Sequence, residues 1–98
     1  MYQEKYFNND NRLNSQAYGS SSHTFLGCTV EESYCDIQGE IHHIVSFRLC
    51  DCRRYLSAEE IRKILIELGM DIDAPIQQLT LRNHSMPGST VYYIQPAA

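Results

Sequence analysis

The sequence predicts a two-layer α+β fold, in which one helix packs on a four-stranded antiparallel sheet in the order β-β-α-β-β. Three observations lead to this prediction. One stretch, residues 57–69, has the apolar period of an amphipathic helix. On either side of it, apolar and polar residues alternate in runs separated by turn sequences, as in β-hairpins. The chain has 98 residues, room for one hydrophobic core, so the hairpins and the helix must share it.

The first 23 residues are predicted to be a disordered polar tail. Asparagine, serine, glutamine and tyrosine dominate residues 1–23, and neither a helical nor a strand period runs through them. Such a composition buries too little apolar surface to offset the conformational entropy that is lost on folding. A single folded domain is therefore predicted over residues 24–98.

The first hairpin is predicted to run over residues 24–30, turn within residues 36–39 and return over residues 41–49. In the return strand, every second residue, starting from position 41, is more apolar than its neighbours. This set is expected to face the helix, because successive side chains of a strand point to opposite faces. The other set, which includes Ile44 and Arg48, is expected on the opposite face of the sheet.

The helix is predicted from local signals at both of its ends. Ser57 and Glu60 are spaced for a capping box, in which each side chain accepts a hydrogen bond from the other residue's backbone N–H. Gly69 stands where a residue of left-handed conformation commonly ends a helix. Ile66 lies on the charged side. The apolar stripe expected to face the core is Ile61, Ile64, Leu65 and Leu68.

The second hairpin is predicted to run over residues 76–83, turn at residues 86–89 and return over residues 90–95. The turn contains a Pro-Gly pair, and glycine accepts the positive φ that a type II turn requires. The side chains expected to face the helix are Leu79, Leu81, Tyr92 and Ile94. Arg82 and Tyr93 are then expected on the opposite face.

Composition and charge weigh against several functional classes. The formal net charge is −4, so the overall field of the chain does not attract a nucleic-acid backbone. No apolar run approaches the roughly 20 residues that span a bilayer, and the N-terminal residues lack the apolar stretch of a secretory signal. We therefore expect an intracellular, cytoplasmic chain with no membrane partner.

No arrangement of nucleophile, base and acid residues typical of an enzyme is recognisable in the sequence. Catalytic groups also need a concave pocket with positioned partners, and one helix on four strands offers little concavity. We therefore expect neither enzyme activity nor a cofactor.

Four cysteines, at positions 28, 35, 50 and 52, raise the question of a metal site. If the first hairpin turned about Ile37 and Gln38, His23 would lie opposite Cys52. His23, Cys50 and Cys52 would then supply three of the four ligands of a tetrahedral zinc site. The spacing lacks the paired C-x-x-C pattern of structural zinc sites. Buried free cysteine more commonly packs as a small apolar side chain. We predict free thiols and no metal, with Cys50, Cys52 and His23 as the ligands of the alternative.

The sheet face away from the helix gives the functional hypothesis. One helix covers one face, and a contiguous apolar set on the other face indicates a contact surface. We therefore expect a non-enzymatic protein-interaction or regulatory module that associates with itself, as a homodimer, or with another protein. The residues expected to make this contact are Phe25, Ile44, Arg48, Arg82 and Tyr93 on the sheet and Ile66 on the helix.

Two alternatives remain at this point. The same face would bind single-stranded nucleic acid if Phe25 and Tyr93 stacked on bases beside Arg48 and Arg82. Ordinary cross-strand pairing explains these residues equally well, and the net charge opposes the nucleic-acid interpretation. The other alternative is a small metal-binding protein that uses the cysteines.

Overall fold

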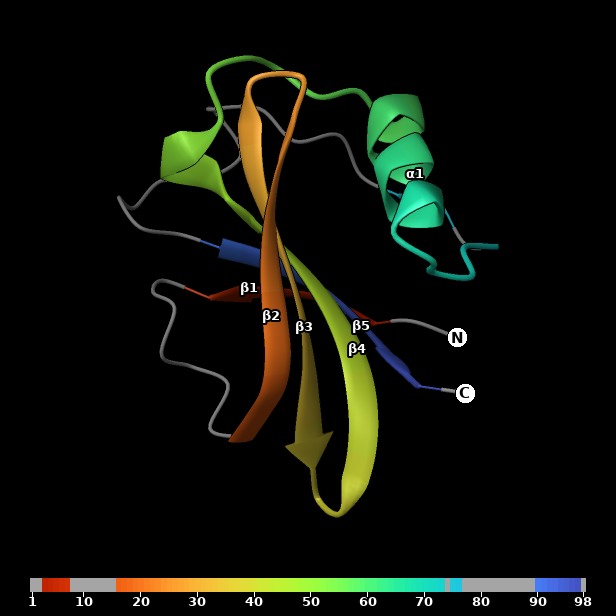
Figure 1. The fold of residues 1–98 in the computed structure, drawn as a ribbon. Coiled ribbons are helices and arrows are strands. Elements are labelled where there is room, and N and C mark those ends of the chain that lie inside the picture. The colour runs from red at the N-terminus through yellow and green to blue at the C-terminus, as the bar shows by residue number, and fades with distance from the viewer. Residues whose placement is uncertain (1–2, 8–15, 74, 77–89, 98) are drawn as a thin grey trace.

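The structure is a computed structural model that describes residues 3–7, 16–73, 75–76 and 90–97. Within these residues, one α-helix packs on a five-stranded antiparallel sheet in the strand order β1-β5-β4-β3-β2 (Figure 1). The predicted α+β class, with one helix on an antiparallel sheet, is confirmed. The elements are β1 (Gln3–Phe7), β2 (Gln16–Phe25), β3 (Cys28–Ile37), β4 (Glu40–Arg48), the 3-10 turn η1 (Leu49–Asp51), α1 (Ala58–Glu67) and β5 (Thr90–Pro96).

Two-residue turns join β2 to β3 and β3 to β4. The first turn consists of Leu26 and Gly27, and the second of Gln38 and Gly39. All four residues have positive φ, as in the type I′ turns whose twist matches that of the flanking strands. Asp36 supports the second turn, since its Oδ1 accepts a hydrogen bond of 2.7 Å from the Gly39 N–H. The turn predicted within residues 36–39 is therefore confirmed.

Strand β2 corrects the predicted start of the folded domain. It runs from Gln16 to Phe25 and pairs with β3, so it crosses the boundary predicted at residue 24. Residues 3–7 also enter the sheet, as β1 beside β5. The described side chains of β2 from Ser20 to Thr24 are polar on both faces, and only Phe25 at the end of the strand packs against the core, so backbone hydrogen bonds hold most of the strand and the sequence shows no alternation there. The other residues of the predicted tail, 1–2 and 8–15, lie outside the described residues.

Helix α1 forms as predicted, with a complete capping box. The Glu60 N–H donates to Ser57 Oγ, and the Ser57 N–H donates to Glu60 Oε1, both at 3.1 Å. The helix ends before Gly69, whose φ is +92°. Its apolar stripe faces the sheet, with Ile61, Ile64 and Leu65 buried and Leu68 packed against them.

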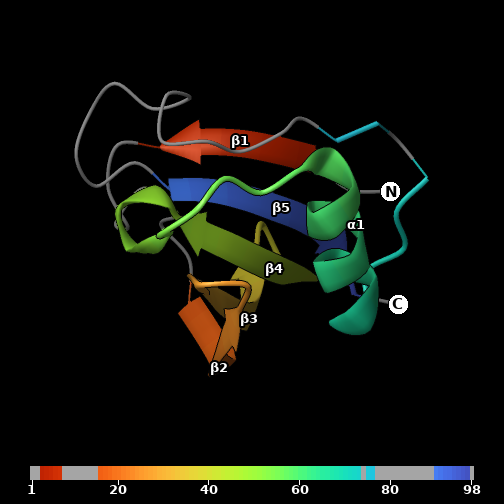
Figure 2. The same cartoon turned by 90° about the horizontal axis from the view of Figure 1, so that it is seen from above.

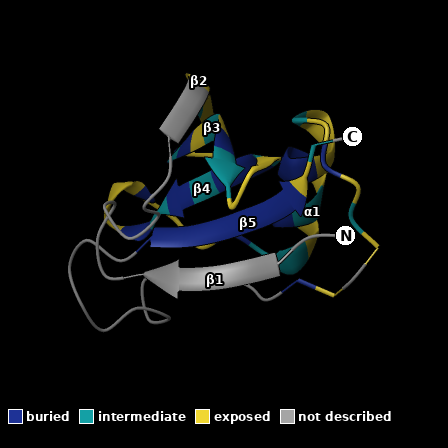
Figure 3. Ribbon diagram, turned by 90° about the horizontal axis from the view of Figure 1, so that it is seen from below, coloured by how far each residue is buried: buried dark blue, intermediate teal, exposed yellow. Residues whose placement is uncertain are grey.

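The main core lies between α1 and the sheet. From β4, Val45 and Phe47 enter it as predicted, and the Phe47 ring meets that of Tyr93 edge to face at 5.6 Å. The buried members are Cys28, Val30, Val45, Phe47, Leu49, Cys52, Leu56, Ile61, Ile64, Leu65, Met70, Ile76, Val91 and Tyr93. Figure 2 shows α1 against this face of the sheet, and Figure 3 shows that burial concentrates along β4 and β5.

The predicted faces of β5 are inverted in the structure. Tyr93 lies opposite Val45, and directly opposite residues of an antiparallel pair share a face, so Tyr93 faces the helix. Tyr92 and Ile94 face away from it, contrary to the prediction. The residues of β5 from Val91 to Ile94 are all apolar or aromatic, so the strand itself carries no alternation and its pairing with β4 decides the faces.

The face away from the helix carries a second, smaller core. Its buried residues are Cys35, Ile44, Tyr92 and Ile94, with Ile37 packed against them. The exposed fraction of these four is 7% or less, so the predicted open apolar face is not open at these positions. The strand predicted over residues 76–83 lies outside the described residues from 77 onward, as do Leu79, Leu81 and the predicted turn at 86–89.

Candidate functional site

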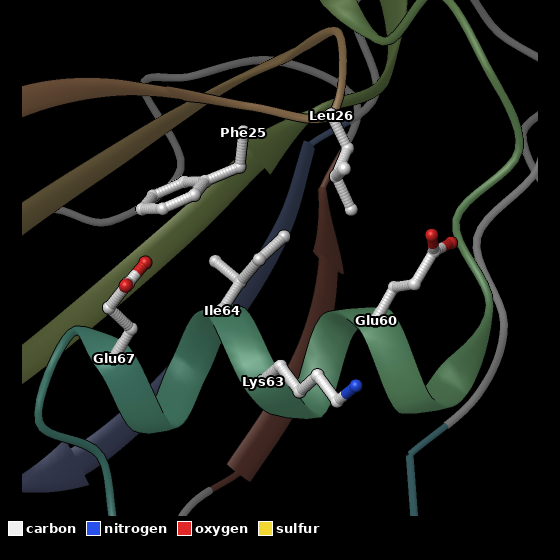
Figure 4. A pocket seen from close by; sticks show the side chains of 6 residues that line it. All are labelled: Phe25, Leu26, Glu60, Lys63, Ile64 and Glu67. Carbon is white, nitrogen blue, oxygen red and sulfur yellow. The ribbon is translucent and has the colours of Figure 1, made fainter.

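A groove of about 350 Å³ lies between α1 and the turn that joins β2 to β3 (Figure 4). The turn contributes one wall and the helix the other. The residues that line the groove are Phe25, Leu26, Glu60, Lys63, Ile64 and Glu67. The groove exists because Gly27 O accepts a 3.0 Å hydrogen bond from the Arg53 N–H, which holds the turn against the segment leading into the helix.

The inner surface of the groove is apolar. Ile64 projects from the helix toward the sheet and is 4% exposed, while Phe25 comes from the end of β2 and is half-buried. Leu26 points from the turn toward the helix, with Ile64 and Glu60 below it (Figure 4). Its side chain is nevertheless 46% exposed, so the groove presents a large apolar surface to water.

Leu26 occupies a backbone conformation that disfavours leucine. Its φ is +50°, in the left-handed region, where an L-residue with a Cβ is strained by about 1–2 kcal/mol. Asparagine or glycine is the usual residue at this position of a type I′ turn. The type I′ turn requires the positive φ, but neither the turn nor the core explains why a leucine with a nearly half-exposed side chain occupies this position. Such strain commonly marks a functional position.

The rim of the groove is charged. Glu60 is paired with Arg54 at 3.1 Å, and its hydrogen bond from Ser57 together with Arg54 holds its pKa below the ordinary value. Lys63 and Glu67 are exposed and have no hydrogen bond or ion pair within the described part of the chain. Figure 4 shows the Glu67 carboxylate on the Phe25 side of the helix and the Lys63 side chain directed along the helix, so Glu67 places a carboxylate without an ion pair among the described residues beside the apolar floor.

The residues predicted to form an interface are not brought together. Ile44 is 1% exposed and Tyr93 is fully buried, so neither is available to a partner. Ile44 does lie away from the helix, as predicted, whereas Phe25 and Tyr93 pack with the helix-side core. The cause is the pairing of β5 with β4, which turns Tyr93 inward.

The remaining predicted interface residues are scattered. Ile66 is 54% exposed on α1, as predicted. Arg48 lies beside Asp51 at 3.9 Å, on the face away from the helix. Arg82 lies outside the described residues. Because Tyr93 is buried and Arg48 belongs to the other face from Phe25, the surface imagined for stacking nucleic-acid bases is not assembled.

Sequence reasoning missed a cluster on β2, β3 and β4. The carboxylate of Glu32 accepts hydrogen bonds from His43 Nε2 at 2.7 Å and from His23 Nε2 at 3.2 Å. The His43 ring stacks on Tyr34, with centroids 4.7 Å apart and planes 10° apart. The cluster ties three neighbouring strands together. Only the true strand register, which places Tyr34 opposite His43, would have identified it.

The cysteines and His23 do not form the alternative metal site. Cys50 is exposed and its thiol faces Asp51 at 3.7 Å, whereas Cys52 is buried beside Cys28 and His23 is bound to Glu32. The predicted hairpin geometry was wrong, because the β3–β4 turn is centred on Gln38 and Gly39 and β3 itself pairs with β2. Among the described residues, no three His, Cys, Asp or Glu side chains are placed to hold a metal ion.

Burial and the neighbouring Cys28 thiol raise the pKa of Cys52 far above its ordinary value, so Cys52 stays protonated and unreactive. All four cysteines are free.

In the part of the chain that the structure describes, no helix is long and apolar enough to cross a membrane. Comparison with known proteins found no match among protein families, curated proteins or solved structures. Function must therefore be inferred from the geometry of this chain.

Proposed function

We propose that the chain is a non-enzymatic protein-interaction module that holds an apolar side chain of a partner in the groove between α1 and the β2–β3 turn. The observation that carries this proposal is Leu26, a strained and half-exposed leucine at a position that suits asparagine or glycine. A contact with a partner would bury the exposed part of Leu26 and thereby offset the strain.

The size and charge of the groove indicate what kind of side chain a partner would place in it. The volume is at the lower end of the about 300–1,000 Å³ of ligand pockets, so it suits a side chain rather than a large cofactor. Phe25, Leu26 and Ile64 favour an aliphatic group. Glu67, which lacks a described partner, favours a basic residue next to that group. The partner is therefore a protein segment with an aliphatic residue next to a lysine or arginine.

A dipeptide tests this chemistry directly. Acetyl-Leu-Arg-amide, titrated into the ¹⁵N-labelled chain, is expected to shift the amide signals of Phe25, Leu26 and Ile64 with millimolar affinity, equivalent to about −4 kcal/mol. Acetyl-Leu-Glu-amide and acetyl-Ser-Arg-amide serve as controls and are expected to bind at least fivefold more weakly. Equal shifts with all three peptides, or shifts spread away from the groove, would contradict the proposal.

Two substitutions separate binding from folding. Leu26→Asn suits the turn but removes the apolar wall, so we expect stability within about 1 kcal/mol of wild type and loss of peptide binding, because turn strain and side-chain burial offset each other. Glu67→Gln is expected to weaken acetyl-Leu-Arg-amide several-fold. Glu59→Gln, a matched exposed change on the same helix outside the groove, is expected to leave binding unchanged.

A further inference from the structure

The outer edge of β2 is a second feature that the groove does not explain. β2 pairs with β3, and no other strand of the described residues lies along its outer edge. After an irregularity between Ala17 and Gly19, the strand is regular from Gly19 to Phe25, and Gly19 to Ser22 and Thr24 are exposed.

This edge lacks the devices that usually protect an edge strand. Natural sheets place lysine, proline or inward-pointing charges on such strands to prevent pairing with another chain. No Asp, Glu, Lys, Arg or Pro occurs anywhere in residues 13–30. The rest of the chain carries all 20 of its charged residues, so this neutral stretch is where a second acidic copy meets least repulsion.

We propose that β2 pairs antiparallel with β2 of a second copy, about a two-fold axis beside Ser22, so that the two sheets become one continuous sheet. Antiparallel pairing about an axis normal to the sheet keeps both helices on the same side. Residues of the same face must then lie opposite each other, so the axis passes beside a residue and not between two residues.

The register follows from the length of the regular segment. An axis beside Ser22 uses every residue from Gly19 to Phe25, whereas an axis nearer either end of the strand would run into the irregularity or into the turn. Ser22 then faces its own copy, Ser21 faces His23, and Ser20 faces Thr24. Gly19 faces Phe25.

Each of these cross-strand pairs suits a sheet. Hydroxyl residues opposite one another exchange hydrogen bonds and stabilise a pair, and no pair places like charges together. An aromatic side chain opposite a glycine on a strand edge compensates for the missing side chain. A strand from another protein would need suitable side chains opposite every residue of this segment. A second copy has them, because the two-fold axis places the same residues there. Two-fold dimers are also the commonest homo-oligomers.

The self-pairing goes beyond the proposed groove function and does not depend on it. Phe25 lines the groove and also ends the paired segment, but Ser22, at the axis, lies outside the groove, so substitutions at Ser22 act on the pairing alone. The mass of the full chain in solution is the first measurement. Sedimentation analysis of the wild type is expected to show a species of twice the 11.3 kDa of one chain. A wild type that stays monomeric up to millimolar concentration would overturn the pairing.

The variant Ser22→Lys tests the interface. It places two ammonium groups opposite each other at the axis, so the dimer is expected to weaken at least tenfold while the exposed position leaves the thermal midpoint of the monomer unchanged. Ser22→Thr, which is neutral and suits a strand, is the matched control and is expected to remain dimeric. A lysine variant that dimerises as tightly as the wild type would overturn the proposal.

Cysteine cross-linking tests the register. Ser22→Cys is expected to form an intermolecular disulfide on mild oxidation, because the two thiols face each other at the axis. Ser20→Cys is expected not to do so above the background that exposed Cys50 gives in the wild type. The reverse result would overturn the register. Binding of acetyl-Leu-Arg-amide to Ser22→Lys, measured alongside, reports on the groove separately, so failure of one proposal is distinguishable from failure of the other.

Discussion

Glu32 is the residue whose removal should show most clearly how the sheet is held together. Glu32→Ala deletes the acceptor for both histidines. His43 has a side chain only 7% exposed and donates at 2.7 Å, so it loses a hydrogen bond to a charged group, which is worth about 1.5–3 kcal/mol. His23 has a side chain 31% exposed and donates at 3.2 Å, so water replaces much of its bond and its share is at most about 1 kcal/mol.

The expected cost of Glu32→Ala is therefore about 2–3 kcal/mol, with most of it arising from His43. In a domain of this size each kcal/mol lowers the melting temperature by about 4–8 °C. Thermal melts followed by circular dichroism, together with urea melts, measure the effect. Glu31→Ala is the matched control, because Glu31 is exposed on the other face of the same strand and should cost less than about 0.5 kcal/mol.

A double-mutant cycle then assigns the energy to the two histidines. We expect the coupling of Glu32 to His43 to exceed its coupling to His23 by at least about 1 kcal/mol, in line with their burial and distances. If Glu32→Ala proved as mild as Glu31→Ala, the cluster would not tie the strands together.

Five substitutions and a pH series test the rest of the fold. Ser57→Ala should destabilise the chain by about 1 kcal/mol through loss of the capping box, and Leu65→Ala by about 2–5 kcal/mol through a core cavity, both measured by urea melts. Ile44→Ala should also cost about 2–5 kcal/mol, and Ile44→Asp should unfold the chain; an Ile44→Asp variant that folded would show that the second core is not packed. Because burial raises the pKa of Cys52 in the folded state, its stabilising contribution is present below the ordinary thiol pKa of 9.0 and is lost as the pH rises above it. The free energy of unfolding, measured by urea melts at pH 8 to 11, should fall by up to about 1.4 kcal/mol per pH unit. Burial also raises the pKa of Tyr92, so this residue should add a decline of the same sign from pH 10.0. The Cys52→Ala variant should lose stability less steeply with pH.

Local signals explain which elements the sequence predicts correctly. The helix has both its capping residues and its apolar stripe within one short segment, so its position and orientation follow from the residues themselves. Strand β4 likewise alternates clearly, and Val45 and Phe47 face the helix as predicted. The β3–β4 turn is predicted from Gly39 and from Asp36, whose side chain accepts a hydrogen bond within the turn.

The other elements depend on contacts between distant residues. Strand β5 has no alternation, so its faces are decided by β4, more than 40 residues earlier. The described side chains of β2 from Ser20 to Thr24 are polar on both faces, so this part of the strand has no apolar pattern to detect. Because the first hairpin was predicted without β3 as a strand of its own, Glu32 could not be placed beside His23 and His43.

Only part of the groove could be predicted from the sequence. Phe25, which lines the groove, was predicted as a contact residue from its chemistry, whereas Ile66, the helix residue predicted with it, does not line the groove. Leu26 could not, because its interest comes from its positive φ and its exposure, and neither is visible until the turn between β2 and β3 is known.

The strand order has a consequence for biosynthesis. Strand β5 lies between β1 and β4, yet it is made after both of them, and Gln3 of β1 pairs with Ile94 of β5 (Figure 2). While the chain emerges from the ribosome, β1 and the inner edge of β4 therefore have no neighbour, and the sheet closes only when β5 appears. Contacts between such distant segments slow folding and leave sheet edges exposed to other chains meanwhile. The same pairing places the two ends of the described chain side by side, so a circular permutant that joins them and opens the β3–β4 turn would make β5 earlier and should fold faster.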